Sequence, residues 1–451
     1  MTRPDRDREQ EADRAGEVVS FPGAEPAEQQ PVPRARSTAP LDTVVGEGRW
    51  HAVDTEDNIT MGRRLRRIRL ARRKTQQVVA DRAGISKGYL SMLERGERTL
   101  DSLRLIVALA GALEIAPSEL TEIPIPAPGN GHTDSVVEAV RLALDAVAVN
   151  SPGGLVLPAD VLAGRVTRLH EMSRRARFPE VAGDLPGLIR DLHTSIAAGR
   201  DVPELLALAV HLHVHVTRMW LGYAGAPVDL RRRAVFLARN MAQEHGEPTT
   251  LGMAAYGTAD VLLTGGGTAG LARAELDSVT LPAATADTVG LLCAVTATRA
   301  LLAAVDGRPG DTDAAMESAA DLAARFGEIG EADPLGFSFG PVNVGIRRMG
   351  LALDAREPDR AVSIARDVRP EQNPFTTTRV RYWIDYGRGA ARLRRQRDDA
   401  IRAFRTAEEL FPVRVYRDPL ARDAIAGLVE RSRADAAGRE LRGLASRAGL
   451  L

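Results

Sequence analysis

The chain is short of the residues on which several protein classes depend. Only one of its 451 residues is cysteine, Cys293, which excludes a disulfide framework and any metal site built from several cysteines. A lone cysteine fits a reducing compartment, and we expect a cytoplasmic protein. Aromatic residues make up only 4% of the chain while hydrophobic residues make up 44%, so the core must consist mainly of Ala, Leu and Val. This composition favours closely packed helices over a β-sandwich.

Long apolar runs are also missing. No segment reaches the roughly 18 uninterrupted apolar residues that a membrane span requires. The first residues, MTRPDRDREQ, have no apolar stretch typical of a secretory signal, so we expect neither a signal peptide nor a membrane partner. The length corresponds to roughly three domains of about 150 residues each.

The net charge is zero, from 60 basic and 60 acidic residues, but the charge is unevenly distributed. Residues 1–57 contain an excess of six acidic residues, and residues 58–122 contain an equal excess of basic residues. The first segment is rich in Pro, Gly, Glu and Gln and predicts a disordered acidic tail. A solvated tail without a specific role is the ordinary interpretation; the alternative is a tail that folds back onto the basic segment.

The basic segment has the apolar spacing of a small helical domain. Apolar residues recur every three to four positions from Met61, and Thr75 and Ser86 can each cap a following helix. Between those helices Gly84 can supply a left-handed turn, and Ala80 lets the helices approach. Two more helices are expected, SLRLIVALAGAL and the short PSEL. The spacing is that of a helix-turn-helix.

Residues 61–120 resemble the DNA-binding domain of the lambda-repressor-like family, also called the Cro/C1 or XRE family. Five expected helices match that domain in order and in loop length, so the resemblance implies an all-α, five-helix domain that binds double-stranded DNA. The chain departs from the family at Gln77-Val78, where acidic residues are frequent, and at Leu100, where proline is frequent. Neither departure affects the turn or the core.

The resemblance implies DNA contacts on the second and third helices. Gln76 and Arg95 would contact phosphates, while Lys87 and Gly88 occupy the family's base-reading positions. Lysine can donate to guanine O6 and N7, whereas a glycine reads no base by side chain. The full set implied for DNA binding is Gln76, Ser86, Lys87, Gly88, Tyr89, Ser91, Met92 and Arg95.

Three features of the same segment have a structural interpretation. Arg69 and Glu94 resemble a buried ion pair that joins the first and third helices, and we favour that role over DNA contact. Core packing is the favoured role for Tyr89, with its hydroxyl near a phosphate as the alternative. The basic run 63–74 is either a solvated helix face or the electrostatic footprint of phosphate binding, and its position beside the recognition helix favours the second.

Residues 123–132, IPIPAPGNGH, are rich in Pro and Gly and predict a linker before a helical domain over 133–451. An alanine-based pattern recurs there with spacings of 38 to 46 residues. The copies are Ala234/Ala238/Met241, Ala272/Leu276/Val279, Ala315/Ala319/Leu322, Ala361/Ala365/Val368 and Ala400/Phe404/Ala407. The last copy resembles a tetratricopeptide repeat, so we expect a tetratricopeptide-like solenoid, with an irregular helical bundle as the alternative.

Other motifs are weaker. Gly265, Gly267 and Gly270 fit G-x-G-x-x-G, but a helical pattern precedes them and a loop is the better interpretation. His211 and His215 share a helix face, but no carboxylate lies one turn on, so no metal site is expected. These two histidines, with Trp220 and Tyr223, are candidates for lining a ligand groove, although aromatic core is the commoner outcome. Cys293 lies in an apolar stretch and is expected to be a buried, inert thiol.

The sequence therefore predicts a bacterial, non-enzymatic transcription regulator without a cofactor. Its repeat domain would dimerise, bind a peptide, small ligand or protein partner, or do both, as the resemblance to peptide-responsive regulators in architecture implies. The alternative is a protein-interaction adaptor that the small domain only localises.

Overall fold

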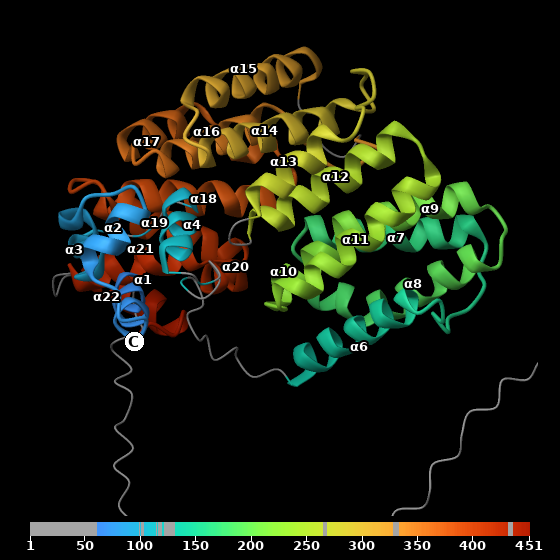
Figure 1. The fold of residues 1–451 in the computed structure, drawn as a ribbon, viewed down its shortest axis with the longest axis horizontal. Coiled ribbons are helices and arrows are strands. Elements are labelled where there is room, and N and C mark those ends of the chain that lie inside the picture. Colours follow the sequence, from blue (N-terminus) through green and yellow to red (C-terminus); the bar gives the residue numbers. More distant parts are fainter. Residues whose placement is uncertain are drawn as a thin grey trace, which may run out of the picture. The chain divides into compact units, whose positions relative to one another are not determined.

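The structure is a computed structural model that describes residues 61–98, 100, 103–113, 115, 120, 131–264, 268–327, 333–431 and 436–451. The predicted tail, 1–57, and most of the linker lie outside the described residues. Within the described ranges all regular elements are helices, as the composition predicts (Figure 1). None of these helices combines the length and apolar character needed to cross a bilayer.

Four helices form the N-terminal domain. They are α1 (Met61–Ala71), α2 (Gln76–Arg82), α3 (Lys87–Glu94) and α4 (Leu103–Leu113). Their shared core contains the fully buried Leu65, Val79, Leu90, Leu93 and Leu109. The expected fifth helix lies outside the described residues except for its last residue, Leu120, which is buried in the same core.

The helical array that follows begins with α6 at Gly131, inside the range that the sequence assigns to the linker. Its helices are α6 (Gly131–Ala148), α7 (Ala159–Arg174), α8 (Phe178–Ala197), α9 (Val202–His211), the π-helix η2 (Leu212–Thr217), α10 (Arg218–Ala224), α11 (Val228–His245), α12 (Pro248–Leu263), α13 (Ala269–Asp277), α14 (Val289–Val305), α15 (Pro309–Phe326), α16 (Pro341–Asp354), α17 (Pro358–Asp367), the 3-10 turn η4 (Pro370–Gln372), α18 (Thr376–Ala391), α19 (Arg397–Leu410), α20 (Pro412–Arg417), α21 (Pro419–Glu430) and α22 (Ala436–Arg447).

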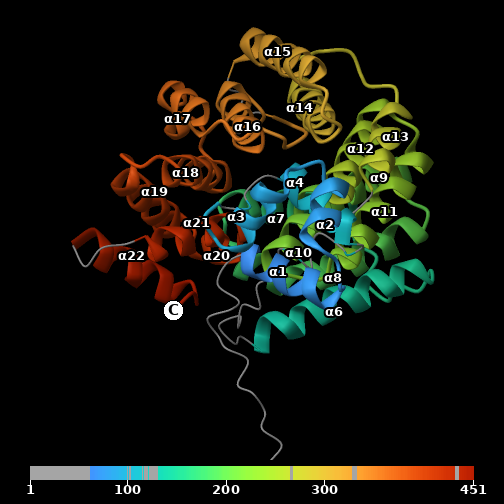
Figure 2. The same ribbon diagram turned by 60° about the vertical axis from the view of Figure 1, so that its left-hand side comes forward.

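Consecutive helices of the array pack in pairs. Contacts join α12 with α13, α14 with α15, α16 with α17, and α18 with α19 (Figures 1 and 2). The first helix of each pair also contacts the first helix of the next pair, from α12 through α14 and α16 to α18. Such stacking lets each pair bury its open face against its neighbour.

The alanine-based pattern coincides with this arrangement. The first two positions of each copy lie on α11, α13, α15, α17 and α19, which are every second α-helix from α11 to α19. The second position of each copy is buried, in the order Ala238, Leu276, Ala319, Ala365 and Phe404. In the last copy a Cβ on Gly387 would lie only 3.0 Å from the Phe404 ring, so the glycine lets α18 and α19 pack closely.

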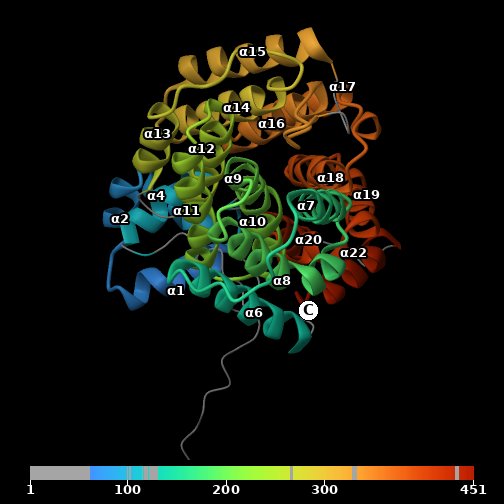
Figure 3. The same cartoon turned by 90° about the vertical axis from the view of Figure 1, so that its right-hand side faces the viewer.

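The beginning and the end of the array share one hydrophobic core, which the repeat pattern does not predict. Phe178 on α8 stacks on Phe411, which precedes α20, with ring centroids 5.6 Å apart. Tyr223 on α10 also stacks on Phe411, at 5.7 Å. The cluster continues from α6 to α22, so helices more than 200 residues apart stabilise each other (Figure 3).

Candidate nucleic-acid interface

The helix-turn-helix is formed by α2, α3 and the turn between them. The hydroxyl of Thr75 accepts a hydrogen bond from the backbone N–H of Val78, and Ser86 does the same for Tyr89, so both predicted helix caps are present. Gly84 has a φ of +66°, the left-handed conformation that this turn requires. The local sequence thus sets the angle between the two helices.

The predicted pair between Arg69 and Glu94 joins α1 to α3. Arg69 Nε and Nη2 donate to the two carboxylate oxygens at 2.5 and 2.8 Å, and both side chains are buried. Hydrogen bonding to Glu94 raises the pKa of Arg69. Gln76 at the start of α2 donates to the same carboxylate at 2.9 Å, so its amide is oriented by this pair.

The N-terminus of α3 presents the predicted base-reading positions to solvent. Ser86, Lys87 and Gly88 are exposed, whereas Ser91 and Met92, one turn later, are half-buried. Lys87 is therefore the long donor side chain available at the start of the recognition helix, consistent with entry of this end into a major groove.

Arg95, the predicted phosphate contact at the end of α3, already has partners. Its guanidinium donates to both carboxylate oxygens of Glu97, at 2.7 and 2.9 Å, and to the Ser91 hydroxyl at 2.6 Å. Hydrogen bonding to Glu97 raises the pKa of Arg95. A DNA phosphate would have to replace Glu97 as the partner of this guanidinium.

The domain is docked against the helical array through α1 and the loop after α3. The backbone N–H of Met61 donates to Oδ1 of Asp423 on α21 at 2.9 Å, and Arg63 pairs with Glu430 on the same helix at 3.2 Å. Burial raises the pKa of Asp423 to about 6, although the backbone N–H groups of Met61 and Leu100 act in the opposite direction. These contacts were not predicted, since nothing in the local sequence of α21 indicates a partner 360 residues away.

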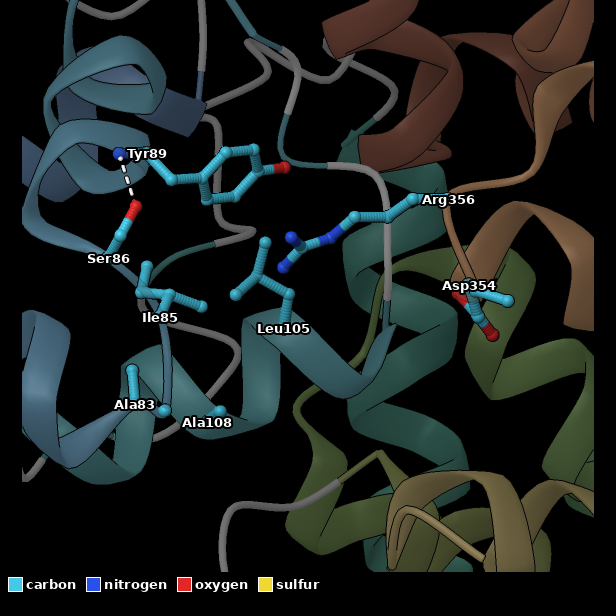
Figure 4. Close-up of a pocket in the computed structure, with 10 residues that line it drawn as sticks. Ala83, Ile85, Ser86, Tyr89, Leu105, Ala108, Asp354 and Arg356 are labelled. Atoms are coloured by element: carbon cyan, nitrogen blue, oxygen red, sulfur yellow. Dashed lines mark hydrogen bonds between the residues drawn. The ribbon is translucent and has the colours of Figure 1, made fainter. Parts of the chain in front are cut away.

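A second contact reaches the recognition helix itself. The turn between α16 and α17 places the Arg356 guanidinium over the Tyr89 ring, 4.2 Å from its centroid, so Tyr89 packs against the array as well as against its own domain. Together with Ser86 and Asp354 these residues line an open cavity of about 540 Å³ (Figure 4). Arg356 is exposed and has a φ of +64°, which is unfavourable for a residue with a side chain.

The candidate groove residues lie in the packed interior in two separate clusters. His211 and His215 contact His170, with a 2.9 Å separation between His211 Nε2 and His170 Nδ1. Burial lowers the pKa of all three imidazoles. His213, between them in the sequence, instead contacts His193, with 2.9 Å between the two Nε2 atoms.

Trp220 and Tyr223 belong to the aromatic core. The Trp220 indole donates to the carbonyl of Phe178 at 3.1 Å, and Tyr223 stacks on the Phe178 ring. Core packing, the alternative left open by the sequence, therefore describes these residues better than a groove. Among the described residues, no group of three or more His, Cys, Asp or Glu side chains is arranged to hold a metal ion.

Two other sequence motifs have structural roles. Helix α12 ends at Leu263, before the glycine-rich motif, and the last glycine of the motif, Gly270, lies in α13. Gly265 and Gly267 lie outside the described residues, and the helix before them is not the strand that a dinucleotide site needs. Cys293 is buried, and burial raises the pKa of its thiol to about 12, as expected for an inert cysteine.

Comparison with known proteins bears on the N-terminal domain. Residues 60–123 match the family model of a helix-turn-helix domain. The chain matches no curated protein and no solved structure. The chain thus carries a helix-turn-helix DNA-binding domain, which agrees with the caps, the turn and the exposed start of α3.

Proposed function

We propose that the protein is a sequence-specific transcription regulator of the lambda-repressor-like type, acting by binding rather than by catalysis, in the bacterial cytoplasm. The observation that carries the proposal is the capped recognition helix whose first residues, Ser86 to Gly88, face solvent beside a basic first helix. A helix end of this kind enters the major groove, and flanking arginines supply phosphate contacts.

The helical array is proposed to be a tetratricopeptide-like solenoid that dimerises and binds a ligand or partner. Support comes from the stacked pairs and from the pattern on every second helix. A dimer would place two recognition helices on a palindrome with half-sites about one helical turn apart. The docked contacts of Met61 and Tyr89 supply a physical route from the array to the DNA-binding domain.

Selection of genomic DNA fragments by the purified full chain tests DNA recognition. Lys87→Ala should lose the preferred sites by about 1–3 kcal/mol of discrimination while retaining binding to other DNA. Arg402→Ala, which removes a charge from an exposed side chain on α19, is the matched control and should select the same sites as the unaltered protein. A uniform loss for Lys87→Ala with a shallower salt dependence would instead make Lys87 a phosphate contact.

The mass of the protein–DNA complex tests the dimer separately. Two chains per operator are expected, and one chain per operator would contradict the dimer without affecting DNA recognition. If no DNA is selected at all while a protein co-purifies in stoichiometric amount, the adaptor alternative replaces the regulator.

A further inference from the structure

A cluster of charged side chains lies inside the helical array, away from the DNA-binding domain. It unites residues from α10, α11, α12, α16 and α18 (Figure 3). Five of its members are arginines and two are aspartates: Arg218, Arg231, Arg347, Arg381, Arg388, Asp260 and Asp385. The arrangement therefore concentrates positive charge where helices from distant parts of the sequence face one another.

Most of these charges form a fixed frame. Arg218 pairs with Asp260 and donates to the carbonyl of Val214 at 3.0 Å. On α18, Asp385 accepts from Arg381 at 2.6 Å and from Arg388 at 2.7 Å. The side chains of Asp260 and Arg381 remain 37% and 40% exposed, so solvent reaches the cluster.

Two arginines of the cluster have no such pairing. In the described residues Arg347 makes no hydrogen bond or ion pair, and Nε of Arg231 is buried without an acceptor. Both guanidinium groups lie near enough to Asp260 to interact with its charge. Burial and, to a smaller extent, neighbouring arginines lower the pKa of both groups.

Half-buried guanidinium groups without acceptors are costly, because burial removes part of their water and protein groups do not replace it. The repulsion between Arg347 and Arg381 adds to that cost. The presence of two unpaired arginines beside paired charges is explained if an anion from outside the chain binds to them. Arginine is suited to this role because its planar fork of donors matches carboxylate and phosphate oxygens.

We propose that Arg347 and Arg231, framed by the Arg218–Asp260 pair and by Arg381, form a binding site for the carboxylate or phosphate group of an anionic ligand. This inference rests on the proposed function, in which the helical array binds a ligand, and it identifies that ligand as an anion. Occupancy of the site neutralises the repulsion between α16 and α18. Because α16 also contacts α4, this change reaches the DNA-binding domain.

Thermal unfolding of the full chain in inorganic phosphate or in acetate, each compared with chloride at equal ionic strength, tests the site without DNA. At an anion concentration about ten times the dissociation constant, the midpoint should rise by about 2–4 °C. Arg347→Gln and Arg231→Gln should abolish this rise. Arg348→Gln is the control, because Arg348 is the exposed neighbour on the same helix and should leave the rise unchanged.

Arg347→Gln has a second readout that a structural role would not give. Without added anion it should raise the midpoint by about 1–3 °C, because it removes a half-buried charge that Arg381 repels. A lower midpoint, or equal anion effects in all three variants, would overturn the proposal. A rise in phosphate alone identifies a phosphorylated ligand, and an equal rise in acetate identifies a carboxylate. DNA selection by the unaltered protein is a separate measurement. The anion site can therefore be disproved without disproving DNA recognition, and the reverse also holds.

Discussion

Two arginines, one in the DNA-binding domain and one in the helical array, show how differently the two parts of the chain accommodate charge. Arg69 in the DNA-binding domain is buried and fully paired, with two short hydrogen bonds to Glu94. Arg347 in the helical array is half-buried and has no hydrogen-bond or ion-pair partner among the described residues. The first arrangement holds a domain together, whereas the second is left incomplete.

The contrast between paired Arg69 and unpaired Arg347 indicates how structural charges can be distinguished from charges that bind a ligand. A buried charge that serves the fold is paired within the fold, because leaving it unpaired costs free energy. A charge that serves binding must keep some of its hydrogen-bonding capacity for the ligand, and it lowers stability until the ligand arrives. Paired Arg69 and unpaired Arg347 should therefore respond oppositely to neutralisation.

The largest effect is expected at the paired site. Glu94→Ala leaves Arg69 buried and uncompensated, and should destabilise the DNA-binding domain by about 3–5 kcal/mol. Hydrogen exchange of the amides in α1 to α3, measured on the full chain, reports this loss locally. The double variant Arg69→Met, Glu94→Leu should recover most of the protection; if it is as unstable as Glu94→Ala, charge pairing is not what the domain depends on.

The features that the sequence predicts are those that depend on residues close together in the chain. The caps at Thr75 and Ser86, the turn at Gly84 and the Arg69–Glu94 pair depend on residues within about one small domain, and the sequence predicts them. The recurring alanines predict where helices pack, since small residues are needed wherever two helices approach closely.

Contacts between distant helices could not be predicted in this way. The bond from Met61 to Asp423 and the stacking of Phe178 on Phe411 depend on how the whole array curves, and curvature accumulates from small rotations at each pair. Spacing along one helix predicts that His211 and His215 share a face, but it cannot reveal His170 as a partner from α7. The arginine cluster gathers residues from five helices, and no spacing along the sequence connects them.

Asp423 provides a second test of how a buried charge is compensated. It is a buried carboxylate that accepts a backbone hydrogen bond from Met61 and has no ion-pair partner among the described residues. Burial raises its pKa to about 6, so it favours the folded state most when protonated, below pH 4, and this stability is lost as pH rises through 6. Asp423→Asn cannot ionise. The difference in unfolding free energy between variant and unaltered protein should therefore grow by up to about 3 kcal/mol from pH 4 to pH 7.

The comparison with the unaltered chain cancels the contributions that the two proteins have in common. A difference that stays flat over this range, or that grows towards acid, would show that Asp423 is as well compensated as Glu94. Urea unfolding at fixed ionic strength supplies the measurement.

A smaller effect is expected where Arg356 covers Tyr89. Arg356→Gly removes the guanidinium and accommodates the left-handed backbone without strain. If Tyr89 must leave this contact to reach DNA, affinity for a selected operator should rise about 2- to 5-fold, the value of an exposed cation–π contact. Arg360→Gly, on the adjoining helix, is the control. A lower affinity with a shallower salt dependence would instead make Arg356 a phosphate contact.

The smallest effect concerns Arg95, whose exposed pairing with Glu97 resembles that of Arg69 in geometry but not in burial. Exposed ion pairs contribute little to stability, so the Glu97→Gln domain should be as stable as the unaltered domain. Releasing the guanidinium should raise DNA affinity by about 1.5- to 5-fold and steepen its salt dependence, because a phosphate no longer competes with Glu97. Binding titrations at several salt concentrations measure both quantities. An unchanged salt dependence would mean that Arg95 does not contact phosphate, and that pairing at the surface and pairing in the core serve the same structural purpose in this domain.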